Sequence, residues 1–121
     1  MRYNTKMKLG DYENFEGPNI FRAALNDDLY EMALAIQAGQ SLADQDDVTF
    51  QTPLHLAVVR KSYHFIKAAV ELDASIVKIR NANNLQPFDI ARSRQDHRAM
   101  QLLYNAEFPE WPIEPSDLNS G

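Results

Sequence analysis

The sequence of 121 residues contains no cysteine, only four glycines and no long apolar run. Without cysteine the chain forms no disulfide and offers no thiolate ligand to a metal. The glycines are scattered, so no glycine-rich loop is present to cradle a phosphate group. The longest apolar run is Met32–Ile36, whereas a membrane-spanning helix needs about 20 apolar residues. We therefore expect no membrane span, no secretion signal and a cytoplasmic location.

Charge is distributed unevenly along the chain, which has a net charge of −5 at pH 7. Residues 11–51 carry nine acidic side chains and one basic, whereas residues 52–104 carry eight basic and four acidic. The acidic front half argues against a nucleic-acid binder, because phosphate recognition requires an excess of basic residues. It favours a basic protein partner, although a solvated acidic surface explains the same balance.

The chain repeats itself at a fixed offset. Thr52–Ala57 aligns with Gln86–Ala91, and a second step of the same size places Ala23 under Ala57. The match continues beyond this segment, where apolar residues stay apolar at Met32–Ile36, Ile66–Val70 and Met100–Tyr104. A fixed period of this size is typical of repeat architectures.

Each copy of the repeat predicts two short helices. Pro53 and Pro87 open the first helix in the second and third copies, because the first helical turn needs no N–H donor there. Thr52 is placed to cap the helix that begins at Pro53. The second helix shows the apolar period of an α-helix, as at Phe65, Ile66, Ala69 and Val70. One such pair cannot bury its apolar face alone, so we expect the pairs to stack.

Three segments resemble the ankyrin repeat. Thr52–Ala57 resembles its Thr-Pro-Leu-His-x-Ala motif, Gln86–Ala91 its terminal variant with Asp for His, and Ala68–Ile76 its Leu-Leu-x-x-Gly-Ala-Asp-Val segment. The resemblance implies an all-α, ankyrin-type solenoid of about three helix-turn-helix repeats. The polar stretches Gln40–Gln51 and Ala74–Gln86 are then hairpin-like connectors.

This interpretation divides the chain into three parts. Residues 18–107 form the repeat domain, with approximate repeats 18–51, 52–85 and 86–107. They lie between an N-terminal extension, 1–17, and a proline-rich acidic tail, 108–121.

The sequence departs from the ankyrin motif in two ways. Asp27, Lys61 and Gln95 replace the glycine that ends the first helix of each repeat. The repeat period is also one residue longer than the usual period of the family.

No catalytic or metal-binding constellation stands out. The resemblance implies a structural role for His55, whereas His64 and His97 fall at exposed positions of second helices. The histidines lack the spacing of a zinc site, and Asp46 and Asp47 lack the spacing of a calcium loop. We predict a non-enzymatic protein without a cofactor or metal. An enzyme with an unrecognised site and a self-associating structural protein remain the alternatives.

The resemblance implies a concave protein-binding face built from inner helices and connector tips. By register the inner-helix residues are Leu25, Asn26, Val59, Arg60, Ser93 and Arg94. The tip residues are Asp46, Asp47, Val48, Gln51, Asn81, Asn83 and Leu85. We predict that this face binds a protein partner, either as an adaptor or as a stoichiometric inhibitor of the immunity type. A homo-oligomer stays open, because an uncovered array end can pair two copies.

The two ends of the chain carry aromatic residues. Tyr3, Tyr12 and Phe15 either pack over the first repeat or belong to a flexible segment. The tail contains three prolines between residues 109 and 115, which predict an extended chain. Trp111 is then either a lid over the third copy, which we favour, or a short motif offered to a partner. Residues 116–121 are expected to be disordered.

Overall fold

A computed structural model of the chain describes residues 16–113, which contain six α-helices, one 3-10 helix and no strand. The elements are α1 (Ile20–Asn26), α2 (Leu29–Gln37), α3 (Pro53–Arg60), α4 (Tyr63–Leu72), η2 (Ala74–Lys78), α5 (Pro87–Ser93) and α6 (His97–Glu107). The described chain is therefore all-α, as predicted. The expectations for Tyr3, Tyr12, Phe15 and residues 116–121 lie outside the described residues. None of the helices between residues 16 and 113 has the length and apolar character that a membrane crossing needs.

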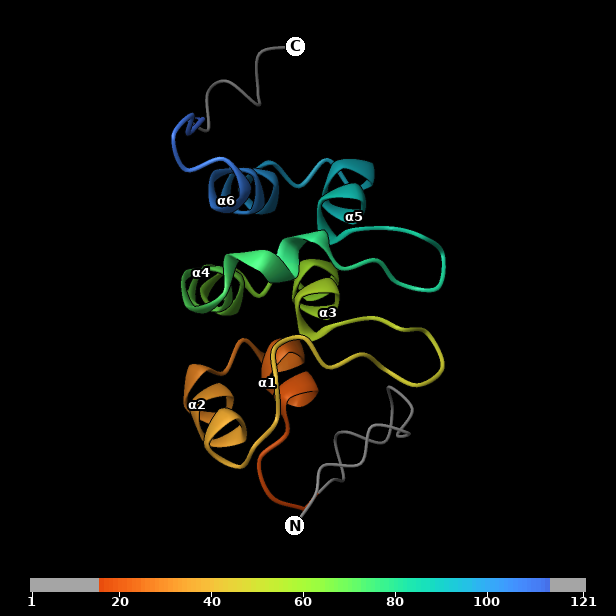
Figure 1. The fold of residues 1–121 in the computed structure, drawn as a ribbon, viewed down its shortest axis with the longest axis vertical. Helices are drawn as coiled ribbons and strands as arrows, with labels where there is room; N and C mark the ends of the chain where they lie inside the picture. The colour runs from red at the N-terminus through yellow and green to blue at the C-terminus, as the bar shows by residue number, and fades with distance from the viewer. Residues whose placement is uncertain (1–15, 114–121) are drawn as a thin grey trace.

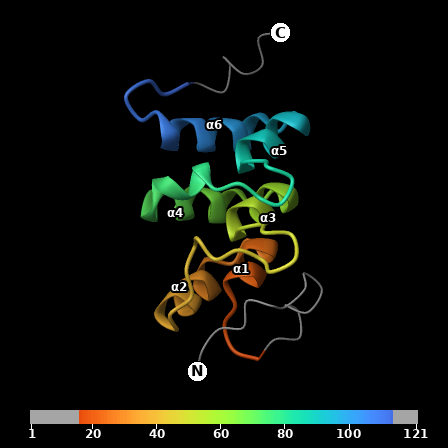
Figure 2. The same cartoon turned by 45° about the vertical axis from the view of Figure 1, so that its right-hand side comes forward.

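The helices form two columns (Figure 1). Helices α1, α3 and α5 stack in one column, and α2, α4 and α6 stack beside them, as the turned view in Figure 2 also shows. Each first helix packs against the second helix that follows it along the chain. The molecule thus consists of helix pairs that contact their neighbours along one axis.

The apolar core lies between the two columns. Ala23, Ala57 and Ala91 recur at the same position of the three first helices, and all three are completely buried. Their small side chains let α1, α3 and α5 approach one another, while larger residues fill the space toward the second column. The largest of these buried residues include Ile20, Phe21, Leu54, Phe65, Ile66 and Leu103. Burial of this apolar surface is the main force that holds the pairs together.

Capping residues set the starts of the helices. Thr52 caps α3 as predicted, because its Oγ1 accepts a hydrogen bond from the His55 backbone N–H at 3.3 Å. The first copy lacks the Thr-Pro-Leu-His motif, and there Asn19 takes the capping role of Thr52. Its side chain accepts a hydrogen bond from the backbone N–H of Arg22 at 2.9 Å. On the second helices, Asp28 and Asp96 cap α2 and α6 in the same way. Unpaired N–H groups at these starts are thereby satisfied.

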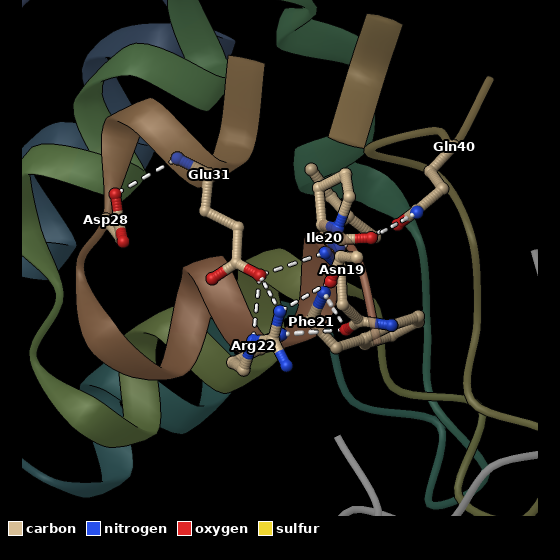
Figure 3. A network of polar contacts seen from close by, with 9 residues as sticks. Asn19, Ile20, Phe21, Arg22, Asp28, Glu31 and Gln40 are labelled. Atoms are coloured by element: carbon tan, nitrogen blue, oxygen red, sulfur yellow. Dashed lines mark hydrogen bonds and ion pairs between the residues drawn. The ribbon is translucent and has the colours of Figure 1, made fainter. Parts of the chain in front are cut away.

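A polar network closes the start of the first copy (Figure 3). One oxygen of Glu31, on α2, accepts from the Asn19 backbone N–H at 3.0 Å and from Arg22 Nε at 2.7 Å. The Gln40 side chain accepts from the Ile20 N–H at 2.7 Å, and its amide nitrogen donates to the chain just before the helix. These bonds join the entry of α1 to α2 and to the chain that follows it. They show how the copy without the motif still forms a helix pair.

Residues with a left-handed backbone conformation recur along the chain at the same spacing as the sequence repeat. Asp27, Lys61 and Gln95 have φ values of 54°, 58° and 55°, and each follows a first helix. Phe50 and Asn84, which are separated by the same period, have φ values of 57° and 63°. A side chain in this conformation costs about 1–2 kcal/mol per residue. The backbone therefore turns in the same way at the end of each first helix, where the ankyrin motif has a glycine that this chain lacks.

The connectors between the pairs are closed by their own hydrogen bonds. In the first, Asp46 N–H donates to Gln51 O at 2.8 Å, and in the second, Asn81 N–H donates to Leu85 O at 3.0 Å. The backbone of residue 82 donates to the backbone of residue 49 at 2.9 Å, so the two connectors contact each other. The second connector opens with η2, which the sequence interpretation did not predict.

Candidate protein-binding face

Both connectors project on the same side of the molecule, beyond the column of α1, α3 and α5 (Figure 1). A hollow of about 340 Å³ lies between their tips and is lined by Val48, Thr49, Gln51, Asn81, Ala82 and Asn83. We call it the tip hollow. Four of these residues, Val48, Gln51, Asn81 and Asn83, are predicted site residues. The structure therefore brings together tip residues that lie about one repeat apart in the sequence.

A second and larger hollow lies where the second connector meets α5. This α5 groove has a volume of about 770 Å³ and is lined by Leu85, Asp89, Ile90, Arg92, Ser93 and Arg94. Leu85, Ser93 and Arg94 are predicted site residues. Asp89, Ile90 and Arg92 were missed, because the register argument selected only two positions on each inner helix. Including every residue of α5 that does not face the core would have found them.

The other predicted residues take part in neither hollow. Asn26, Asp47 and Arg60 are exposed, and Val59 is half-buried. Leu25 is buried in the core, contrary to the expectation that its side chain lies on the binding face. The reason is that α1 packs against both α2 and α3, so this position of the first helix is covered.

Asp46 also differs from the expectation for a tip residue, since only 3% of it is exposed. Its Oδ1 accepts hydrogen bonds from the backbone N–H groups of Val48 at 2.8 Å and Thr49 at 3.0 Å. Aspartate often stabilises a turn by bonding to the backbone two residues later. Asp46 therefore shapes the first connector and does not present its carboxylate to a partner.

Phe50 is an exposed residue that the sequence interpretation missed. It is 50% exposed and has positive φ, an unusual combination for an aromatic residue. Val48 nearby is 63% exposed. Strained backbone conformations persist only where the surrounding structure holds them. Here the Phe50 N–H donates to Asp46 O at 2.8 Å, which fixes the turn and leaves an apolar surface at the first connector.

His55 links α3 to the second connector. Its Nδ1 accepts from the Thr52 backbone N–H at 3.1 Å, and its Nε2 then donates to Leu85 O at 2.8 Å. Burial lowers the pKa of His55, against smaller opposing effects of the Leu85 carbonyl and the Asp89 carboxylate. The imidazole is therefore held neutral, in agreement with a structural role. Its bond positions Leu85 at the edge of the α5 groove.

The remaining histidines lie on second helices. His64 is exposed as predicted, and its Nδ1 lies 2.8 Å from Asp27 Oδ2. The other oxygen of Asp27 accepts from the Phe65 N–H at 2.7 Å, so Asp27 ties the end of α1 to α4. His97 was expected to be exposed but is half-buried, because it begins α6 beside the end of α5. Its Nδ1 has no hydrogen-bond partner within residues 16–113.

One further titratable pair lies between helices. The Tyr63 hydroxyl donates to both carboxylate oxygens of Asp96 at 3.0 Å. Burial, together with this bond to a negative group, raises the pKa of Tyr63. Asp96 at the same time caps α6, so its oxygens are occupied by structural bonds. In the part of the chain that the structure describes, no cluster of three His, Cys, Asp or Glu residues is placed to hold a metal ion.

Trp111 does not form the lid that we favoured. Trp111 is 75% exposed, so its ring does not cover the end of the third copy. The tail instead returns to α6 through its backbone, where Ile113 N–H donates to Asn105 Oδ1 at 2.8 Å. The amide nitrogens of Gln101 and Asn105 lie 3.3 and 3.4 Å from Ile113 O. Trp111 thus lies in an anchored turn with its side chain in solvent.

Comparison with known proteins gives one informative similarity. The chain is 26% identical over 72 residues to the I-Kappa-B like protein H1 of Microplitis demolitor bracovirus (isolate Webb). The aligned region covers 60% of this chain and 38% of the viral protein. No family model matches the sequence, and no solved structure matches the fold.

Proposed function

We propose that the chain is an ankyrin-type repeat array that binds a protein partner without catalysis. The observation that carries this proposal is the recurrence of the same backbone turns. One turn occurs in every repeat, at Asp27, Lys61 and Gln95, and a second occurs in both connectors, at Phe50 and Asn84. A repeat that returns in the backbone as well as in the side chains supports a stacked array of equivalent units.

Two further observations support the ankyrin type. Thr52 and His55 are the polar residues of the Thr-Pro-Leu-His motif, and they bond to each other at the start of α3. His55 also bonds to Leu85 O and so joins α3 to the second connector. The similarity to an I-Kappa-B like protein points the same way, since proteins of that kind are typically ankyrin-repeat proteins. On this proposal the array spans residues 18–107, with repeats 18–51, 52–85 and 86–107.

The composition of the connector side supports protein binding. Val48, Phe50 and Leu85 are exposed apolar side chains, and Arg60 and Arg94 are exposed cations. Exposed aromatic and arginine side chains are the usual anchors of protein interfaces. A specific interface buries about 800 Å² on each partner. The tip hollow, the α5 groove and the surface between them are the part of the molecule that we assign to this contact.

Within this class the protein acts either as an adaptor or as a stoichiometric inhibitor. An inhibitor covers the active or binding site of its partner and abolishes that activity at a ratio of one to one. An adaptor leaves the activity of its partner intact. The two roles differ in the activity of the partner, so the partner itself must be assayed.

The test is affinity capture with a matched pair of variants. The double variant Arg60→Glu, Arg94→Glu reverses two exposed charges, one at the end of α3 and one just after α5. The control is Lys67→Glu, which reverses one exposed charge on α4, in the other column of helices. We expect wild type and Lys67→Glu to retain one partner and the double variant to lose it, with unchanged circular dichroism. Retention by the double variant would place the binding site elsewhere. A dimer seen by light scattering, without a partner, would favour self-association instead.

A further inference from the structure

The α5 groove combines an apolar edge with a surplus of positive charge. Leu85 and Ile90 contribute apolar surface, while Arg92 and Arg94 contribute two guanidinium groups. Asp89 is the one acidic residue in its lining, and it lies 3.7 Å from Arg92. Arg94 has no ion-pair partner among residues 16–113. The groove therefore holds a cation whose donors are not used within the described chain.

Few acidic side chains lie in the part of the sequence that surrounds α5, and three of the four make hydrogen bonds within the fold. Residues 52–104 contain four of them, Glu71, Asp73, Asp89 and Asp96. Asp73 accepts from Ser75, Asp89 from the Gln86 N–H and Asp96 from Tyr63. These bonds hold the three carboxylates in the fold, and within residues 16–113 none of them forms an ion pair with Arg94. The lining of the groove thus carries two positive charges and one negative charge, although the whole chain is negative.

The geometry points to an acidic, aliphatic peptide segment of a partner protein as the occupant of this groove. A carboxylate side chain of the segment pairs with Arg94, because guanidinium and carboxylate form two parallel charged hydrogen bonds. An aliphatic side chain packs against Leu85 and Ile90. This inference rests on the proposed protein-binding function and specifies its chemistry. It also reverses the expectation of a basic partner, as far as this groove is concerned.

The volume of the groove agrees with such an occupant. At about 770 Å³ it lies within the range of roughly 300–1,000 Å³ that is usual for ligand pockets. It is bounded by a connector whose edge His55 holds in place through Leu85 O. A site whose wall is fixed before binding costs less entropy on association than one that must be ordered.

The test begins with an unbiased choice of ligand. Random dodecapeptides displayed on phage are selected on the immobilised full-length protein, and the peptides that bind are sequenced. We expect an excess of Asp and Glu together with Leu, Ile, Val or Met. A selection that yields no binder, or binders without acidic residues, overturns the inference.

Binding of one selected peptide is then measured by fluorescence anisotropy. We expect Arg94→Glu to weaken it at least about tenfold, because an attractive charged hydrogen bond becomes a repulsion. Lys67→Glu, which reverses the charge of an exposed lysine on α4, should leave the affinity within about twofold, since Lys67 does not line the groove and exposed charges are screened by salt. A peptide with Lys in place of its essential acidic residue should regain affinity for Arg94→Glu. Equal binding by wild type and Arg94→Glu would overturn the inference.

The same variants separate this inference from the proposed function. If Arg94→Glu loses the selected peptide but still captures the cellular partner through other residues, protein binding stands and the groove is not its site, which overturns the inference. If peptide and partner are lost together in Arg94→Glu and a selected peptide displaces the partner from wild type, both proposals are supported. Circular dichroism of each variant shows whether the helices remain folded.

Discussion

At the scale of single residues, backbone conformation explains side chains that look out of place in the sequence. Lys61 stands at the left-handed turn after α3, where glycine has no steric cost. Its side chain is exposed, and no side-chain hydrogen bond of Lys61 holds it there within the described residues. Asp27 occupies the equivalent position but bonds to Phe65 and His64. The same strain is therefore compensated by side-chain bonds at Asp27 and not at Lys61.

We predict that Lys61→Gly raises the free energy of unfolding by about 0.5–1 kcal/mol, because relief of the left-handed strain exceeds the entropy that glycine adds to the unfolded chain. Asp27→Gly should lower it, since two bonds to α4 are lost. Lys67→Gly, inside α4, is the control and should cost about 1 kcal/mol. Urea unfolding monitored by circular dichroism measures all three. A destabilised Lys61→Gly would contradict the strain argument.

His55 gives the chain a dependence of stability on pH. Burial lowers its pKa in the folded state, so below about pH 6.5 the unfolded chain binds more protons than the folded one. The free energy of unfolding should therefore fall as the pH decreases from 7.5 toward 5. His55→Gln should be less stable at pH 7.5 by about 1–3 kcal/mol, since buried bonds to Thr52 and Leu85 are lost.

The measurement is urea unfolding at both pH values for wild type and His55→Gln. The free energy of unfolding should differ less between the two pH values in His55→Gln than in wild type, because the variant lacks the buried imidazole whose pKa is lowered. His64→Gln is the comparison variant, because it removes an exposed imidazole together with its contact to Asp27. An identical pH dependence in wild type and His55→Gln would show that another group is responsible.

At the scale of elements, polar bonds and one aromatic contact hold residues 108–113 against helix α6. The Asn105 amide holds Ile113 through the backbone, while Phe108 rests its ring at 4.8 Å from that of Tyr104. These contacts anchor the turn on either side of Trp111. The exposed Trp111 side chain takes part in none of these contacts.

We predict that Trp111→Ala changes the free energy of unfolding by no more than about 0.5 kcal/mol, as is usual for exposed positions. Asn105→Ala should release the tail and lower the steady-state fluorescence anisotropy of Trp111, the single tryptophan of the chain. Asn26→Ala, an exposed amide on α1, is the control. A large loss of stability in Trp111→Ala would contradict this prediction and support the role of the side chain as a lid.

At the scale of the whole molecule, each helix pair is stabilised by its neighbours. Helix α3 contacts both α1 and α5, and α4 contacts both α2 and α6. Among the described elements, the outer pairs have such a neighbour on one side only. In an array of this kind, stability is roughly the sum of the units and their nearest-neighbour interfaces. The outer pairs should therefore open more easily than the middle one.

We predict that Leu103→Ala, which removes a buried side chain from α6, costs about 2–4 kcal/mol. Hydrogen exchange should then quicken more in α5 and α6 than in α1 and α2. Leu54→Ala in the central helix α3 is the matched change and should quicken exchange in every pair. Uniform acceleration by Leu103→Ala would mean that the molecule opens only as a whole.

The sequence by itself determined the helix pairs and their period. Prolines, capping residues and the helical apolar pattern are local signals, and they reinforce one another because they recur along the chain. It also pointed to residues on the connector side, of which Val48, Gln51, Asn81 and Asn83 line one hollow. These features depend on short stretches of chain, which is why residue order alone reveals them.

Tertiary structure decided which of those residues are accessible. Asp46 and Leu25 are buried, Trp111 is exposed and His97 is half-buried, because burial depends on what packs against a side chain from another part of the fold. The α5 groove likewise exists only where the second connector closes against α5, with His55 holding Leu85 at its edge. A period in the sequence specifies equivalent positions, whereas contacts between neighbouring pairs determine how each position differs from the next.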